Sequence, residues 1–143
     1  MLSGTVLAFD FGLKRIGVAV GEFELCMAHP LVTLNGSDLL QTMAAIDKLI
    51  KEWQPSVLIV GQPRHSDGRP HALTGAVETF VAHLHAHTTL DVILTDESYS
   101  SAAASIALRD AGVRGQKQKA LLDSVAAQEI LQGYFDNHVS TQR

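Results

Sequence analysis

Hydrophobic residues along this chain come in short bursts, and the spacing within the first bursts is that of β-strands. The stretch from Thr5 to Phe9 is rich in strand-forming residues and ends at Asp10-Phe11-Gly12, where a glycine can turn the chain. Residues 15–20 and 25–34 predict two further strands. The links between these three segments are short, which favours an antiparallel meander.

Helical spacing begins in the next segment. Ser37 is the predicted N-cap, and Pro55 is expected to end the helix, so the helix should span about residues 38–53. Its apolar stripe recurs every three to four residues and consists of Leu39, Leu40, Met43, Ile46, Leu49, Ile50 and Trp53. The continuous apolar run Val57–Val60 then predicts a central strand that is covered on both faces.

The second half of the chain alternates between the two patterns. A loop rich in turn formers, residues 61–70, precedes a helix over about 73–87 and a fifth strand at 92–95. Two more helices are expected at about 100–111 and 119–135, joined by a linker at 112–116 and followed by a polar tail at 138–143. Three meandering strands followed by alternating helices and strands predict an α/β fold with a mixed five-stranded sheet. This is the element order of the RNase H-like fold.

Composition limits the possible functions of the chain. With 143 residues, 46% of them hydrophobic, it can bury one core, so we expect a single domain over residues 1–137. No apolar run approaches the length of a membrane span and no secretory signal precedes the first strand, so a cytoplasmic protein is expected. Cys26 is the only cysteine, which excludes an intrachain disulfide and a cysteine-rich zinc site and favours a small buried residue.

Acidic residues stand where a catalytic site would need them. Asp10 ends the first strand, Asp96 and Glu97 end the fifth, and Asp123 lies near the start of the last helix in an otherwise apolar stretch. If the two strands are parallel neighbours, these carboxylates converge at the carboxyl edge of the sheet. Carboxylates suit Mg²⁺ or Mn²⁺, and two such ions can support phosphodiester hydrolysis. The plainer alternative is that Asp10 caps a turn, the Asp96-Glu97 pair is solvated, and Asp123 interacts with the helix dipole.

Three sequence blocks, in order and covering nearly the whole chain, resemble the YqgF family of Holliday junction resolvases and pre-16S rRNA processing nucleases. The blocks are Ala8 to Ala19, Val60-Gly61-Gln62-Pro63 with Ser66-Asp67-Gly68, and Asp96-Glu97 with Leu122 to Ala127. The resemblance implies a metal-dependent nuclease in which Asp10, Glu97 and Asp123 are the catalytic, metal-binding triad, with two Mg²⁺ or Mn²⁺ ions. Strand alternation agrees that only one of the neighbours Asp96 and Glu97 can face the site.

The chain departs from the family pattern at three places. Ser98 stands where the family usually has arginine, Gln62 where it has leucine or a similar residue, and Lys117-Gln118-Lys119 where it has a glycine between basic residues. These departures leave the triad intact and concern the substrate contacts.

Basic residues are the candidates for nucleic-acid contact. The formal net charge is −4, so any polyanion must be bound by a local basic patch. The candidates lie beside the first turn, in the loop after the fourth strand and before Asp123; they are Lys14, Arg15, Arg64, Arg114, Lys117 and Lys119. Ordinary surface charge is the alternative for each of them.

Several functions remain open on the sequence alone. The nuclease hypothesis favours processing of the 5′ end of pre-16S rRNA, with resolution of branched DNA in recombination and repair as the alternative. A non-catalytic RNA-binding module of ribosome assembly is the second class of function. A phosphotransferase of the sugar-kinase and actin class is the third, although such proteins need two domains. The expected partner is pre-rRNA or branched DNA, with the protein as a monomer or homodimer and without a membrane.

Overall fold

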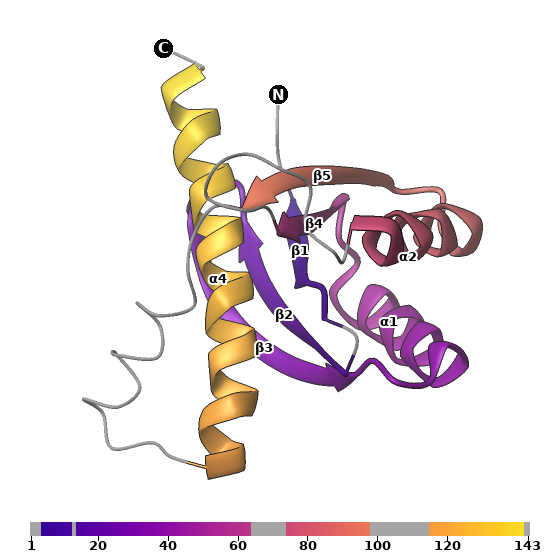
Figure 1. The fold of residues 1–143 in the computed structure, drawn as a ribbon. Helices are drawn as coiled ribbons and strands as arrows, with labels where there is room; N and C mark the ends of the chain where they lie inside the picture. Colours follow the sequence, from indigo (N-terminus) through magenta and orange to yellow (C-terminus); the bar gives the residue numbers. More distant parts are fainter. Residues whose placement is uncertain (1–3, 13, 64–73, 98–114, 142–143) are drawn as a thin grey trace.

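A five-stranded mixed sheet forms the centre of the computed structural model, which describes residues 4–12, 14–63, 74–97 and 115–141 (Figure 1). Its order is β3-β2-β1-β4-β5. The strands are β1 (Thr5–Asp10), β2 (Arg15–Glu22), β3 (Met27–Asn35), β4 (Val57–Pro63) and β5 (Asp91–Glu97). Strands β1, β2 and β3 pair antiparallel, which confirms the predicted meander, whereas β4 pairs parallel with both β1 and β5.

The order of the strands differs from one expectation. β4 is an interior strand, as its apolar run predicted, but the middle position belongs to β1. β4 also separates β1 from β5, so the two strands that carry the candidate acids are not neighbours. The reason is that β1 already pairs with β2 on one side, which leaves its other side for β4.

Helices cover both faces of the sheet. Helices α1 (Leu39–Trp53) and α2 (Thr74–His87) lie on one face, and the long helix α4 (Gly115–Thr141) crosses the other (Figure 1). Strand alternation gives each face its own core, so Leu7 and Phe9 of β1 pack towards α1 and α2, whereas Val6 and Ala8 pack towards α4.

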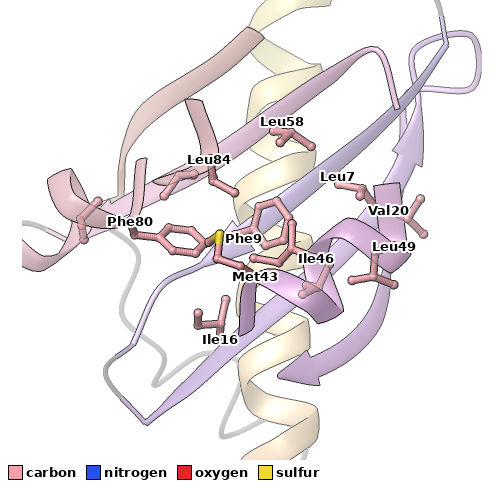
Figure 2. Packing of buried hydrophobic residues seen from close by; sticks show 13 residues of the cluster. Leu7, Phe9, Ile16, Val20, Met43, Ile46, Leu49, Leu58, Phe80 and Leu84 are labelled. Carbon is pink, nitrogen blue, oxygen red and sulfur yellow. The ribbon is translucent and has the colours of Figure 1, made fainter. Parts of the chain in front are cut away.

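The core beneath α1 and α2 is the larger of the two clusters. Figure 2 shows Phe9 and Ile16 of the sheet packed against Met43 and Ile46 of α1, with Phe80 of α2 beside them. Val77, Phe80 and Leu84 of α2 are buried in this core. Leu40, by contrast, is 83% exposed and lies outside the core, although the α1 stripe included it.

Both ends of α1 are capped, and the N-cap differs from the predicted residue. Asp38, not Ser37, is the N-cap, because its side chain accepts hydrogen bonds from the backbone N–H groups of Leu40 and Gln41. Ser37 instead donates its hydroxyl and its backbone N–H to Asn35. Gln54 closes the helix in the left-handed conformation, directly before Pro55.

Helix α4 is longer than the sequence predicted. The expected helix covered residues 119–135, whereas α4 runs from Gly115 to Thr141 and includes the end of the expected linker and most of the expected polar tail. No proline interrupts residues 115–141, and packing on the sheet stabilises the helix where its propensity is modest. The helix expected at 100–111 lies outside the described residues.

Cys26 lies in the turn between β2 and β3 and is only partly buried, so the prediction of a small buried residue was wrong. Its φ of 51° is left-handed, and its thiol donates a hydrogen bond to the carbonyl oxygen of Phe23. A turn residue with this backbone sits at the rim of the core.

None of the described helices combines the length and apolar character that a membrane crossing requires.

Candidate active site

Asp10 is the last residue of β1 and lies at the carboxyl edge of the parallel part of the sheet. It is level with Gly17 of β2 on one side and with Gly61 of β4 on the other. Alternation along β1 places it on the α4 face, after Val6 and Ala8, which belong to the core under α4. Both strand neighbours of Asp10 are therefore glycines, which carry no side chain on this face.

Asp123 reaches the same place from α4. A Cβ atom on Gly17 would overlap with the backbone carbonyl oxygen of Asp123, so helix and strand touch backbone to backbone at this point. Asp10 pairs with that same glycine. The first and the last candidate acid of the sequence therefore both adjoin Gly17.

A further close approach between α4 and β2 lies at Gly21. A Cβ atom on Gly21 would lie 2.6 Å from the carbonyl oxygen of Met27 and 2.7 Å from the Phe135 ring. Gly17 and Gly21 are four residues apart in a strand and so share a face. Neither glycine was predicted from the sequence as part of the site, although paired glycines within a strand indicate a close approach of another element.

Position 97 lies on the same face but further away. Thr95 is level with Gly61, and Glu97 is level with Pro63, so Glu97 is two strands from Asp10 and two residues further along. Its register shares the α4 face with Ile93, whereas Asp96 shares the opposite face. This parity agrees with the choice of Glu97 over Asp96, and the Glu97 side chain lies outside the described part of the structure.

Asp123 forms an ion pair that the sequence analysis did not anticipate. The Nε atom of Arg15 donates to Oδ2 of Asp123 at 2.6 Å. The Arg15 side chain is 45% exposed and the Asp123 side chain 21%, so the pair sits at the surface end of the contact between α4 and β2. Arg15 begins β2 two residues before Gly17, which puts it on the α4 face as well.

The position of Asp123 also removes one plain explanation for it. The predicted helix placed Asp123 near its start, where a carboxylate favours the helix dipole. Because α4 begins at Gly115, Asp123 lies beyond the first two turns, where the dipole effect has decayed.

The structure describes only some of the other residues predicted to contact nucleic acid. Lys14 is exposed next to Arg15, and its carbonyl oxygen accepts a hydrogen bond from the Gly36 N–H group. Lys117 and Lys119 belong to the first turns of α4, before Asp123, and their side chains lie outside the description. Arg64 and Arg114 lie outside the described residues altogether.

Among the side chains that the structure describes, no three His, Cys, Asp or Glu residues gather at one point. Asp10 and Asp123 both adjoin Gly17 at one edge of the sheet, and Glu97 occupies a register position on the same face.

Comparison with known proteins finds a matching family and similar relatives. The family model described as "RuvX: Holliday junction resolvase" matches residues 4–137. A protein of Nitrosospira multiformis named "Putative pre-16S rRNA nuclease" is 50% identical over 139 residues, covering 97% of this chain and 92% of its own. A protein of Methylobacillus flagellatus with the same name is 52% identical over 137 residues, covering 96% of this chain and 94% of its own.

Solved structures support the fold assignment. The RuvC structure of Thermus thermophilus superposes with a TM-score of 0.57 at 14% identity and covers 96% of this chain and 97% of its own. The Fowlpox virus resolvase bound to Holliday junction DNA gives a TM-score of 0.55 at 12% identity and covers 93% and 97%. At these identities the likeness concerns the fold, and it confirms the RNase H-like sheet.

Proposed function

The chain belongs to the RuvX family of Holliday junction resolvases and is a nuclease of the RNase H-like fold. From this premise we propose that it is a divalent-metal-dependent endonuclease whose catalytic acids are Asp10, Glu97 and Asp123. The observation that carries the proposal is the backbone contact of Asp123 with Gly17, the strand partner of Asp10. Because a side chain at position 17 would force α4 away, the glycine is what allows the two acids to adjoin.

The donor set fits Mg²⁺ or Mn²⁺. Carboxylate oxygens are the ligands that hard divalent cations prefer in proteins, and the chain's single cysteine lies in the turn between β2 and β3. Asp10, Glu97 and Asp123 would hold the metal, most simply as two ions. When bound, such ions supply a hydrolytic water and stabilise charge on the phosphodiester.

The chain's own residues have three tasks in this proposal. Asp10 is fixed by pairing on both sides within the sheet, so it is the rigid member of the triad. Asp123 is held by helix packing and Glu97 by the end of an edge strand. Lys14 and Arg15, with Lys117, Lys119, Arg64 and Arg114 as further candidates, would neutralise phosphates and position the substrate.

The proposed substrate is the precursor of 16S rRNA, cleaved at its 5′ end during ribosome biogenesis. Relatives that share about half of their residues with this chain over nearly its full length carry the name "Putative pre-16S rRNA nuclease". Branched DNA is the second candidate, favoured by the description of the family and by the fold shared with resolvases solved on Holliday junctions. The protein would act on either substrate in the cytoplasm.

Parallel cleavage assays on a pre-16S rRNA fragment and on a synthetic four-way junction test the proposal. We expect Mg²⁺-dependent cleavage of the RNA, abolished by D10N, because asparagine keeps the shape but removes the charge that binds the ions. D91N is the matched control, since Asp91 is exposed at the opposite end of β5 from the site. Cleavage of the junction alone would favour the resolvase. Tight RNA binding without cleavage of either substrate would favour the non-catalytic assembly module, and D10N activity equal to the parent would exclude Asp10 as a ligand.

A further inference from the structure

The ion pair of Arg15 with Asp123 joins a candidate phosphate contact to a candidate metal ligand. One bond, from Arg15 Nε to Asp123 Oδ2, carries the interaction. Arg15 starts β2 and Asp123 lies in α4, 108 residues further along the chain. A guanidinium group and a divalent cation would therefore compete for the same carboxylate.

The position of Arg15 makes this overlap geometric as well as electrostatic. Asp10 is level with Gly17. Arg15 comes two residues before Gly17 in β2 and so lies past the end of β1. Side chains of a helix lean towards its N-terminus, so the Asp123 carboxylate leans back towards the edge where Arg15 begins its strand. The guanidinium thus lies at the mouth of the site formed by Asp10 and Asp123.

The ion pair is partly exposed to water. Arg15 is 45% exposed, and ion pairs of this exposure contribute little net stability because water screens them and both side chains lose freedom. A residue that fixes a metal ligand in place is normally locked by packing. Arg15 is better suited to let go of Asp123 than to hold it rigidly.

We propose that Arg15 is an exchangeable counter-ion: it neutralises Asp123 in the metal-free protein, is displaced when a divalent cation takes the carboxylate, and then becomes a phosphate contact. The inference rests on the proposed function, since it needs Asp123 to bind metal. It makes metal and substrate binding mutually reinforcing, because the cation that occupies Asp123 releases the arginine that the phosphate needs. Reciprocity requires that nucleic acid also tighten metal binding.

Metal affinity without nucleic acid gives the first test. Mn²⁺ titration, followed by electron paramagnetic resonance, compares the parent with R15Q, R15K, K14Q and D123N. Removing a competing ion pair of surface strength should tighten Mn²⁺ binding about two- to fivefold in R15Q. R15K keeps the charge and should stay near the parent. K14Q removes the same charge from the neighbouring exposed residue and should change the affinity less than R15Q does.

The outcomes separate this inference from the proposed function. Absence of Mn²⁺ binding to the parent, or unchanged binding by D123N, would overturn the metal site and the inference with it. A D123N defect with R15Q equal to the parent or to K14Q would leave the metal site standing and overturn the exchange. Weaker binding in R15Q would show that Arg15 orients Asp123 as an outer-shell partner, which also overturns it.

Nucleic-acid affinity measured against salt concentration gives the second test. In Ca²⁺, the parent should show a steeper salt dependence than in EDTA, by about one phosphate contact or roughly 0.7–0.9 in slope. R15Q should show no such increase. Equal increases in the parent and in R15Q would show that metal does not release Arg15 to the substrate.

Discussion

Two carboxylates on α4 illustrate how the environment of a single residue decides its role. Asp123 lies where the helix touches β2 and is neutralised by Arg15. Glu129, six residues further along, is partly buried, and that burial raises the pKa of its carboxyl group. The first acid is thus compensated by a charge that can move, whereas the second is desolvated on the flank of the α4 core.

The raised pKa of Glu129 predicts how stability depends on pH. A carboxyl group with a raised pKa in the folded state favours folding in its protonated form, so its contribution is full below the unfolded pKa of about 4.3 and is lost as pH rises through the folded pKa. We therefore expect E129Q to increase the free energy of unfolding at pH 7 and to have little effect near pH 4. Urea denaturation at both pH values measures this, with E52Q on the exposed end of α1 as control. A gain that is equal at both pH values would contradict the prediction.

At the scale of elements, the contact between α4 and β2 determines whether the site can form. We expect G17A to destabilise the protein by about 1–3 kcal/mol, because its methyl group would meet the Asp123 backbone and not a side chain that could move. The same variant should lose cleavage activity, since any relief of the clash moves Asp123 away from Asp10.

G75A is the matched control for this prediction. Gly75 is the second residue of α2, and a Cβ atom there would meet nothing within 4 Å. The alanine should therefore stabilise the protein by up to about 1 kcal/mol through its helix propensity and reduced unfolded-state entropy. Urea unfolding of both variants, together with their cleavage rates, checks the pair; equal stabilities of G17A and the parent would mean that α4 is not anchored at Gly17.

The insertion of β4 between β1 and β5 makes a second prediction at this scale. Neighbouring strands lie about 4.8 Å apart and residues rise about 3.3 Å, so position 97 is about 10 Å sideways from Asp10 and about 7 Å further along. A site that spans this distance needs the longer side chain at the outer position. We expect E97D to reduce metal affinity and cleavage even though the charge is kept.

D96N is the control for E97D, because position 96 is on the opposite face of β5. It should leave Mn²⁺ affinity close to that of the parent. If D96N impairs metal binding and E97D does not, Asp96 is the third acid, and β5 departs from regular alternation at its end.

The charge of the whole molecule sets its affinity for nucleic acid. With a net charge of −4, binding must depend on the metals and on a few local cations. Three to five phosphate contacts would give a salt slope of about −0.9 per contact on duplex DNA and about −0.7 on single strands. Binding should weaken clearly between low and physiological salt, but by less than for strongly basic nucleases.

Lys117 and Lys119 provide a test of this dependence on local cations, because both lie in α4 shortly before Asp123. Replacing both by alanine should reduce the magnitude of the slope by up to about two units without changing sequence preference, since phosphate contacts do not specify sequence. Binding in Ca²⁺ suppresses cleavage during the measurement. An unchanged slope would place the substrate path elsewhere, with the segment that contains Arg64 as the next candidate.

The sequence by itself determined the elements and their chemistry. Alternating and helical spacing of apolar residues predicted the five strands and the helices α1 and α2, because periodicity follows directly from which side of an element meets the core. It also placed Asp10 at a strand end and, through alternation, separated Asp96 from Glu97. The family resemblance named the triad, and membership of the RuvX family confirms the nuclease.

The tertiary structure decided the strand order, the length of α4 and the long-range contacts, which spacing along the chain does not encode. Strand order put β4 between β1 and β5, and the full length of α4 appeared because packing on the sheet, not propensity, sustains that helix. The ion pair of Arg15 with Asp123 and the approach of Asp123 to Gly17 join residues more than 100 positions apart. Spacing along the chain says nothing about such pairs, since only the packing of a helix onto a strand fixes which residues meet.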